Sequence, residues 1–213
     1  MSGNDLRLLI ERGDVEGMQR ALADNPALAN QTVHWVVNQA NESDPLHYVS
    51  DSVFHGWLTN GTEGEIASVL LAHGAAIEGS EGRESPLIAA ASLGAEKVAR
   101  VLLEAGAALE PTSVFGARAL HWAAWMGLSS TVDRLLKRGA QLEPRCSEFG
   151  ATPLFWAVHG YGPNGAKHKR DQLGAARLLI GAGAHVDTAN KNGLAARDLA
   201  AQCAKREMYE LLR

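Results

Sequence analysis

The stretch RALHWAAWMGLSSTVDRLLKRGAQLE, residues 118–143, recurs in varied form along the chain and decides the fold. Its first eight residues align with three other segments: DPLHYVSD from Asp44, SPLIAAAS from Ser85 and TPLFWAVH from Thr152. Each copy leads into an amphipathic stretch with a Gly-Ala near its end, namely SVLLAHGAAIE, RVLLEAGAALE, DRLLKRGAQLE and RLLIGAGAHVD. A leucine holds the third position of every copy, and successive leucines lie 41, 33 and 34 residues apart. A period of this length predicts a repeat architecture.

Each copy carries the start and stop signals of a pair of helices. Asp44, Ser85 and Thr152 are favourable N-caps, and each is followed by a proline, which suits the first helical turn. The glycine of each Gly-Ala stands where a helix must end in a left-handed conformation. These glycines are Gly74, Gly106, Gly139 and Gly183. Because one helix pair cannot bury its own apolar face, we expect the pairs to stack on one another.

These motifs resemble the ankyrin repeat, in which TPLHxAA opens the first helix and VxxLLxxGAxxx closes the second. The resemblance covers nearly the whole chain, since LRLLIERGDVEGMQRALADNPALAN is similar to a divergent first repeat and NKNGLAARDLAAQCAKREMYELLR to a last one. It implies an all-α solenoid of about six helix-turn-helix repeats with short β-hairpin fingers. We expect one domain over residues 1–213, with repeats at approximately 1–31, 32–78, 79–111, 112–144, 145–187 and 188–213, the first and last acting as caps.

Two of the predicted repeats are longer than the others. From the start of the first-helix motif to the glycine of Gly-Ala, two repeats take 20 residues, at 86–106 and 119–139. The other two take 29 residues, at 45–74, and 30 residues, at 153–183. The additional residues lie near VFHGWLTNGTEGE and GYGPNGAKHKRDQ, which predicts two insertions between first and second helices. Loops added to a rigid scaffold are where function concentrates.

The composition excludes several classes of function. The 213 residues are 46% hydrophobic and carry a net charge of −4, which fits one domain with a core and argues against a nucleic-acid binder. Cys146 and Cys203 lie far apart without a CxxC, so we expect neither a disulfide framework nor a metal-binding one. No apolar run of about 18 residues exists, and charges interrupt the first apolar segment, so we expect a cytoplasmic protein.

Two histidines and a carboxylate stand four residues apart in HYVSDSVFHGW: His47, Asp51 and His55. On a helix this spacing would place them on one face, as in a metal site or an acid–base relay. The resemblance instead gives His47, the histidine of TPLH, a local bond that bridges neighbouring fingers. It places Asp51 on the exposed inner face of the first helix, whereas His55 lies beyond the expected helix end. With no cysteine or fourth ligand nearby, we expect neither a metal nor another cofactor.

The aromatic residues predict a binding surface in the C-terminal half of the chain. Trp125 and His159 hold a position that, by the resemblance, faces the concave side and has no packing role. Trp122 and Trp156 hold a position where burial is favoured. An exposed tryptophan marks a binding site, so Trp125 is the first candidate. The full set of candidate partner-binding residues is Trp125, His159, Tyr161, Trp122, Trp156, Phe115, Phe149, Asp51, Trp57, Lys167, Lys169 and Arg170.

Two functions from different classes remain open. The first, which we favour, is a non-catalytic protein–protein interaction module whose protein partner docks on the concave aromatic face, steered by the basic loop at 166–172. The chain offers no nucleophile–base pair or phosphate loop that would indicate an enzyme. The alternative is an ankyrin scaffold adapted as a small-molecule-binding protein or enzyme, with a pocket walled by the two insertions and with Tyr48, Asp51, His121 and His159 as polar anchors. We expect a monomer that binds neither nucleic acid nor membrane.

Overall fold

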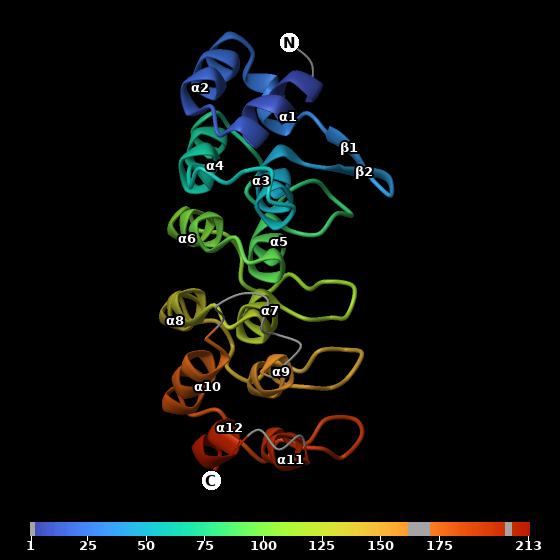
Figure 1. Cartoon of the computed structure of the whole chain (residues 1–213), viewed down its shortest axis with the longest axis vertical. Helices are drawn as coiled ribbons and strands as arrows, with labels where there is room; N and C mark the ends of the chain where they lie inside the picture. Colours follow the sequence, from blue (N-terminus) through green and yellow to red (C-terminus); the bar gives the residue numbers. More distant parts are fainter. Residues whose placement is uncertain (1–2, 162–170, 203–205) are drawn as a thin grey trace. The chain divides into compact units, whose positions relative to one another are not determined.

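Helices dominate both compact units into which the chain divides, Met1–Ala108 and Leu109–Arg213. The computed structural model describes residues 3–161, 171–202 and 206–213 (Figure 1). The predicted all-α class is therefore confirmed. Among the described helices, none has both the length and the apolar character needed to cross a membrane.

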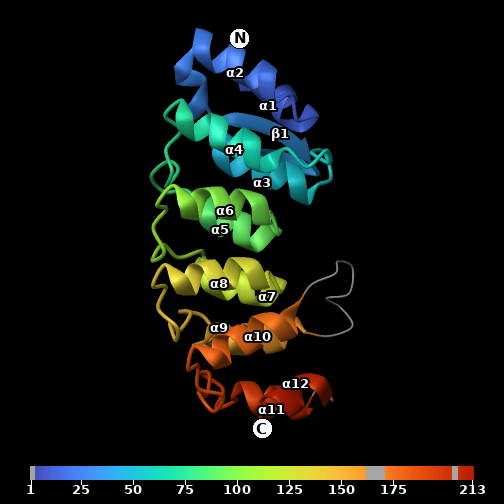
Figure 2. The ribbon, with the colours of Figure 1, turned by 90° about the vertical axis from the view of Figure 1, so that its left-hand side faces the viewer.

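The first unit is built from helices that follow one another in antiparallel pairs. Its helices are α1 (Gly3–Arg12), α2 (Val15–Asp24), α3 (Pro45–Phe54), α4 (Glu63–Ala72), α5 (Pro86–Leu93) and α6 (Glu96–Glu104), with a short 3-10 helix η1 (Pro26–Asn30). Helix α3 packs against α5, and α4 packs against α6 (Figure 2). The motif leucines Leu46 and Leu87 are both 1% exposed, and Leu70 is fully buried. These leucines form the core that joins one pair to the next, as the repeat pattern predicts.

The second unit repeats this arrangement. Its helices are α7 (Ala119–Met126), α8 (Ser129–Lys137), α9 (Pro153–Gly160), α10 (Gln172–Gly181), α11 (Ala196–Gln202) and α12 (Arg206–Leu211). Helices α7, α9 and α11 pack in one row, and α8, α10 and α12 pack in a second row (Figure 1). Leu120 of α7 and Leu154 of α9 are both buried. The loops that precede α7, α9 and α11, which we call the fingers, project beside the first row.

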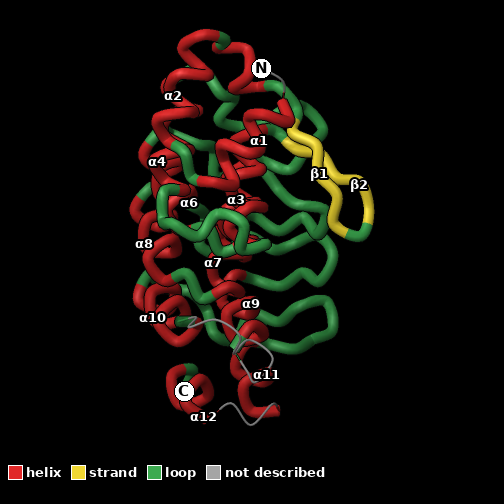
Figure 3. The backbone as a smooth tube through the Cα atoms, turned by 45° about the horizontal axis from the view of Figure 1, so that its top comes forward, coloured by secondary structure: helices red, strands yellow, loops and turns green. Residues whose placement is uncertain are grey.

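Strands occur, among the described residues, only in the hairpin that precedes α3. Strands β1 (Val33–Val37) and β2 (Gln39–Ser43) pair antiparallel, from Val33 opposite Ser43 to Val37 opposite Gln39 (Figure 3). In the second unit a backbone hydrogen bond instead joins the two sides of each finger. These bonds run from the N–H of Ser113 to Ala117 O (2.9 Å), of Cys146 to Ala151 O (3.1 Å) and of Asn190 to Leu194 O (2.9 Å).

Helix ends follow the predicted signals with one exception. The four Gly-Ala glycines have φ between 84° and 100°, so each ends its helix in the left-handed region that favours glycine. The side chains of Ser85 and Thr152 cap their helices by accepting bonds from Ile88 N and Phe155 N. Asp44 occupies the N-cap position of α3, but its carboxylate accepts from Ser80 N and Oγ, both at 2.7 Å. The prediction of Asp44 as a capping side chain was therefore wrong.

Two helix pairs have short connections between their helices, and two have long ones. Residues 94–95 join α5 to α6 and residues 127–128 join α7 to α8, whereas residues 55–62 join α3 to α4 and residues 161–171 join α9 to α10. Of the last segment, the structure describes residues 161 and 171.

Candidate functional site

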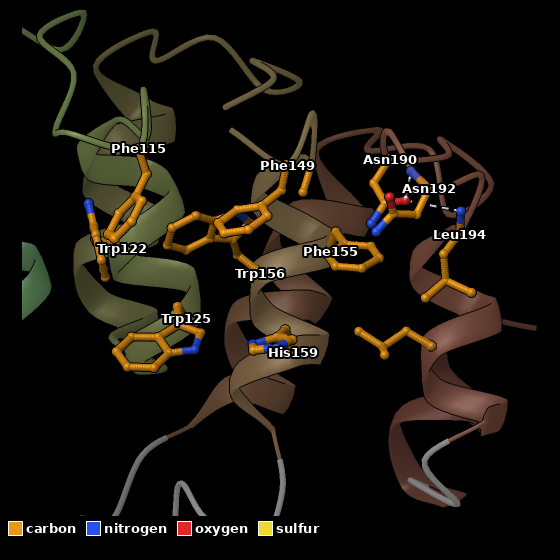
Figure 4. Close-up of a pocket in the computed structure, with 12 residues that line it drawn as sticks. Phe115, Trp122, Trp125, Phe149, Phe155, Trp156, His159, Asn190, Asn192 and Leu194 are labelled. Carbon is orange, nitrogen blue, oxygen red and sulfur yellow. Dashed lines mark hydrogen bonds between the residues drawn. The ribbon is translucent and has the colours of Figure 1, made fainter. Parts of the chain in front are cut away.

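A pocket of about 440 Å³ opens on the second unit, beside the first row of helices (Figure 4). Helix α7 contributes Trp122 and Trp125 to its wall, and α9 contributes Trp156 and His159. Figure 4 shows these four side chains projecting toward the same space from neighbouring helices. The described residues that line the pocket are Phe115, Trp122, Trp125, Phe149, Ala151, Phe155, Trp156, His159, Asn190, Asn192, Leu194 and Leu199.

The tryptophan rings of the pocket pack edge to face. Trp122 is central: its ring centroid lies 4.9 Å from that of Trp156 at an interplanar angle of 80°, and 5.8 Å from that of Trp125 at 83°. Above them, the centroids of Phe115 and Phe149 lie 6.2 Å apart. The indole N–H of Trp122 donates to Ser113 Oγ at 3.2 Å, which fixes the orientation of this ring. Such perpendicular contacts are favourable beyond the area that they bury.

The pocket has a buried floor and a partly exposed rim. Phe155 and Trp156 are 7% and 8% exposed, and they belong to a buried apolar cluster. Trp122 and Trp125 are half-buried, whereas Phe149 at the tip of its finger is 45% exposed. Half-exposed aromatic side chains around a concave surface are typical of a binding site, since they cost solubility unless a partner covers them.

Backbone bonds between fingers hold the rim residues in register. The carbonyl oxygen of Phe115 accepts from Glu148 N at 3.2 Å, and that of Phe149 accepts from Lys191 N at 2.9 Å. Each fingertip is therefore fixed to the residue that precedes the next fingertip.

The structure corrects the expectation that Trp125 has no packing role. Its ring meets Trp122 edge to face and packs against the buried cluster. Its carbonyl oxygen accepts from Gln172 Nε2 at 3.2 Å. Gly160 approaches the same carbonyl so closely that a Cβ there would lie 2.2 Å from the oxygen. Trp125 therefore supports the second unit as well as lining the pocket.

His121 lies beneath the pocket and holds α7 to the next finger. The backbone N–H of Arg118 donates to Nδ1 of His121 at 3.1 Å, so the ring proton resides on Nε2. Nε2 in turn faces the carbonyl oxygens of Pro144 at 3.1 Å and Ala151 at 3.2 Å. The residue is fully buried, and burial lowers its pKa to about 4, because a protonated ring would carry its charge away from water without a counter-ion. His121 is thus a neutral structural group, not an exposed anchor.

The polar residues of the first unit do not join this site. Asp51 is 9% exposed and accepts from Ser43 Oγ at 3.3 Å and His47 Nδ1 at 2.9 Å. The prediction of Asp51 on an exposed inner face was therefore wrong, because the carboxylate is turned inward to these two donors. The expectation that His47 bridges neighbouring fingers was also wrong, since the bond that the structure gives it runs to Asp51, and His121 is the histidine that bridges fingers. Tyr48, also proposed as an anchor, is buried and donates to Glu11 at 2.6 Å.

A small polar pocket of about 230 Å³ lies beside His47 in the first unit. Its lining residues are Glu42, Ser43, Asp44, His47, Arg83 and Glu84. Burial raises the pKa of Glu84, and the nearby charge of His47 acts in the opposite direction. Within the described ranges, no group of three or more His, Cys, Asp and Glu side chains has the geometry to hold a metal ion.

The remaining predicted site residues lie apart from the aromatic pocket. Trp57 belongs to the first unit, where its ring stacks on His55 at a centroid distance of 4.5 Å. Tyr161 does not line the pocket, and its hydroxyl donates to Glu207 at 2.9 Å. Its pKa is raised mainly by desolvation and to a smaller extent by this bond. The basic residues Lys167, Lys169 and Arg170 lie outside the described residues, as does most of the GYGPNG segment.

Half of the pocket lining was not anticipated from the sequence. The missed residues are Ala151, Phe155, Asn190, Asn192, Leu194 and Leu199. Alignment of the fingers on their glycines offered a signal, since Asn192 precedes Gly193 as Phe115 and Phe149 precede theirs. The prediction of the last repeat as a cap gave it no part in the site, whereas four of its residues line the pocket.

Comparison with known proteins agrees with the arrangement of the helices. Residues 59–146 match the family model of ankyrin repeats, three copies. The chain is also similar to a solved ankyrin repeat domain from Acinetobacter baumannii AYE, with a TM-score of 0.73 and 24% sequence identity over 98% of this chain and 95% of that one. No curated protein matches the sequence.

Proposed function

We propose that this chain is a non-catalytic module that binds a protein partner at the aromatic pocket of the second unit. Residues 59–146 match the family model of ankyrin repeats, and the fold is that of an ankyrin repeat domain. Ankyrin repeats are in general protein–protein interaction modules. The proposal adds the surface on which that interaction takes place.

One observation carries the proposal: a cluster of half-exposed aromatic rings surrounds a pocket whose floor is already packed. Phe149 at 45% exposure and the half-buried Trp122 and Trp125 present apolar area to solvent next to one another. Burial of that area by a partner is favourable, at about 25 cal/mol per Å². Tryptophan is also among the residues that dominate measured interface energies.

The alternative of a small-molecule site walled by the two long connections has less support. Its pocket would need lining residues from 55–62 and from 161–171. None of the described residues in those segments lines the aromatic pocket, which is built from α7, α9, α11 and the fingers. An open site formed by fingers and first helices favours a docking segment of a partner.

A peptide-display selection on the full chain tests the proposal while the natural partner is unidentified. Affinities of selected peptides are measured by titration, with tryptophan emission as the signal, because Trp122, Trp125 and Trp156 all line the pocket. Phe149→Ala should weaken binding by about thirtyfold, since truncation of an aromatic hot-spot residue typically costs about 2 kcal/mol.

Phe54→Ala is the matched control. Phe54 is also a partly exposed phenylalanine, 56% exposed, but it lies on α3 in the first unit. Its truncation should leave the affinity unchanged. Equal affinities of both variants and the parent would place the binding surface elsewhere.

A further inference from the structure

The third residue after the N-cap is a hydrogen-bonding histidine in α7 and an apolar phenylalanine in α9, and both helices line the pocket. In α7 this residue is His121, three positions after Arg118, and it links its own N-cap to the next finger through Nδ1 and Nε2. In α9 the same position is Phe155, three positions after Thr152. A phenyl ring can neither accept from the N-cap nor donate to a finger carbonyl. Phe155 therefore cannot make, in the α9 repeat, the hydrogen bonds that His121 makes in the α7 repeat.

Phe155 gains a different role in exchange. Its ring is 7% exposed, belongs to the same buried cluster as Ala151 and Trp156, and lines the pocket. Leu194 and Leu199 of the last repeat pack against that cluster (Figure 4). The position that fixes a finger in the preceding repeat is here part of an apolar floor. This exchange extends the pocket from α7 across α9 to α11.

The pocket favours an occupant without charge. Its described lining holds no Asp, Glu, Lys or Arg, and its polar side-chain groups are the amides of Asn190 and Asn192, the ring of His159 and the indole N–H groups of the three tryptophans. An ammonium group could meet the faces of the tryptophans, but it would lose part of its water without gaining a carboxylate from the described lining. A carboxylate would find no cation among the described lining residues.

The rings also favour a flat occupant. Trp122 meets Trp125 and Trp156 at angles of 83° and 80°, so their planes form perpendicular corners. A further aromatic ring can enter such a corner and continue the edge-to-face pattern. The volume of about 440 Å³ lies in the range of pockets that enclose small organic groups.

We propose that this pocket seats an uncharged aromatic side chain of the partner, in contact with Phe155, which takes the place of the finger-fixing histidine. The inference rests on the proposed function and specifies the chemistry of its anchor residue. It makes Phe155 the residue that determines which side chain is accepted.

The test uses three fragments of equal ring size on the full chain: 3-methylindole, which is uncharged, tryptamine, which is cationic, and indole-3-acetate, which is anionic. Binding is followed by methyl NMR at Ala151, Leu194 and Leu199, all of which line the pocket. We expect 3-methylindole to bind at least tenfold more tightly than either charged fragment. Equal or tighter binding of tryptamine or indole-3-acetate at these methyl groups, or no binding of 3-methylindole, would overturn the inference.

Two variants then test the role of Phe155. Phe155→Leu keeps an apolar floor but removes the ring, and it should weaken 3-methylindole binding about two- to tenfold. Phe155→His restores donors at this position and should weaken it about tenfold or more, with the fold verified by methyl dispersion. A purely structural role predicts instead that both folded variants bind as the parent does.

The two proposals can fail separately. If selected peptides bind at the pocket through a charged anchor, the proposed function stands and the inference about the anchor is wrong. If 3-methylindole binds at the pocket but no selected peptide depends on Phe149, the pocket's preference for an uncharged ring stands, whereas the proposed docking surface is wrong and the ring cannot be assigned to a protein partner.

Discussion

His121 and Trp156 meet edge to face, with ring centroids 5.5 Å apart and planes inclined by 69°. The histidine is fully buried and bonded to three backbone groups, whereas Trp156 lines the pocket. The hydrogen-bond network of the scaffold therefore touches the floor of the proposed binding site directly. Protonation or replacement of His121 should therefore affect both the stability of the fold and the position of the Trp156 ring.

Stability should fall on acidification because of His121. Its pKa is about 4 in the folded chain and near the ordinary value of 6.5 when unfolded. Between these values the unfolded state binds more protons, so the free energy of unfolding decreases as the pH falls from about 6.5 to 4. Urea unfolding at pH 7.5 and pH 5 should show this decrease, with an upper limit of roughly 3 kcal/mol over the full window.

His185→Gln provides the control, because His185 is an exposed histidine in the same unit. It should keep the pH dependence of the parent. His121→Gln should be less stable at pH 7.5 and should show a smaller loss between pH 7.5 and pH 5. An unchanged loss in His121→Gln would show that other groups cause the acid sensitivity.

Trp125→Ala should affect both stability and binding. The ring packs against Trp122 and the buried cluster, so its removal should lower the free energy of unfolding. The loss should be smaller than the roughly 2–5 kcal/mol expected when the buried Leu120 is changed to Ala. Urea titrations measure this loss. Affinity per folded molecule should also fall, by about thirtyfold if the ring is an interface anchor. Unchanged affinity per folded molecule would assign Trp125 to the core alone.

Gly160→Ala should destabilise the second unit through backbone contact. Gly160 is the last residue of α9, and an added Cβ would lie 2.2 Å from the carbonyl oxygen of Trp125. We expect a cost of about 1–3 kcal/mol, seen as a lower thermal midpoint. Gly181, the last residue of α10, is the matched control, because a Cβ there meets nothing within 4 Å. Gly181→Ala should be neutral or stabilising by up to about 1 kcal/mol; a loss equal to that of Gly160→Ala would refute the contact.

Unfolding should proceed as one transition if the predicted repeats form a single domain. Leu87→Ala in the first unit and Leu120→Ala in the second each truncate a buried motif leucine. Because each repeat relies on its neighbours, both variants should shift the far-UV circular dichroism and tryptophan-emission transitions together. Two separated transitions in either variant would mean that the two units unfold independently.

Features set by local backbone chemistry were predictable from the sequence. The Gly-Ala glycines end helices because a left-handed residue is required there, and this requirement involves only a few neighbouring residues. The capping bonds of Ser85 and Thr152 are equally local, since each runs to a backbone N–H three residues further along the chain. The buried motif leucines followed from the spacing of apolar positions, which is a property of a helix face.

Features set by contacts between repeats were not predictable in this way. Asp51 shares the sequence spacing of an exposed position, yet Ser43 and His47 draw its carboxylate inward. Trp125 was expected to have no packing role, but it packs as well as lining the pocket, since its contact with Trp122 and the approach of Gly160 depend on tertiary placement. The motif TPLF shows that Phe155 replaces the histidine of the preceding copy, but its place in the pocket could be interpreted only once the structure showed the hydrogen bonds of His121.

The finger-to-finger backbone bonds, from Glu148 N to Phe115 O and from Lys191 N to Phe149 O, have a consequence for how such a surface can evolve. They use main-chain atoms alone, so they survive any exchange of the fingertip side chains. Phe115, Phe149 and Asn192 stand at corresponding places next to these bonds. On the proposed binding surface, single substitutions at these three positions would therefore change which partner is preferred, while the backbone bonds keep the spacing of the fingertips.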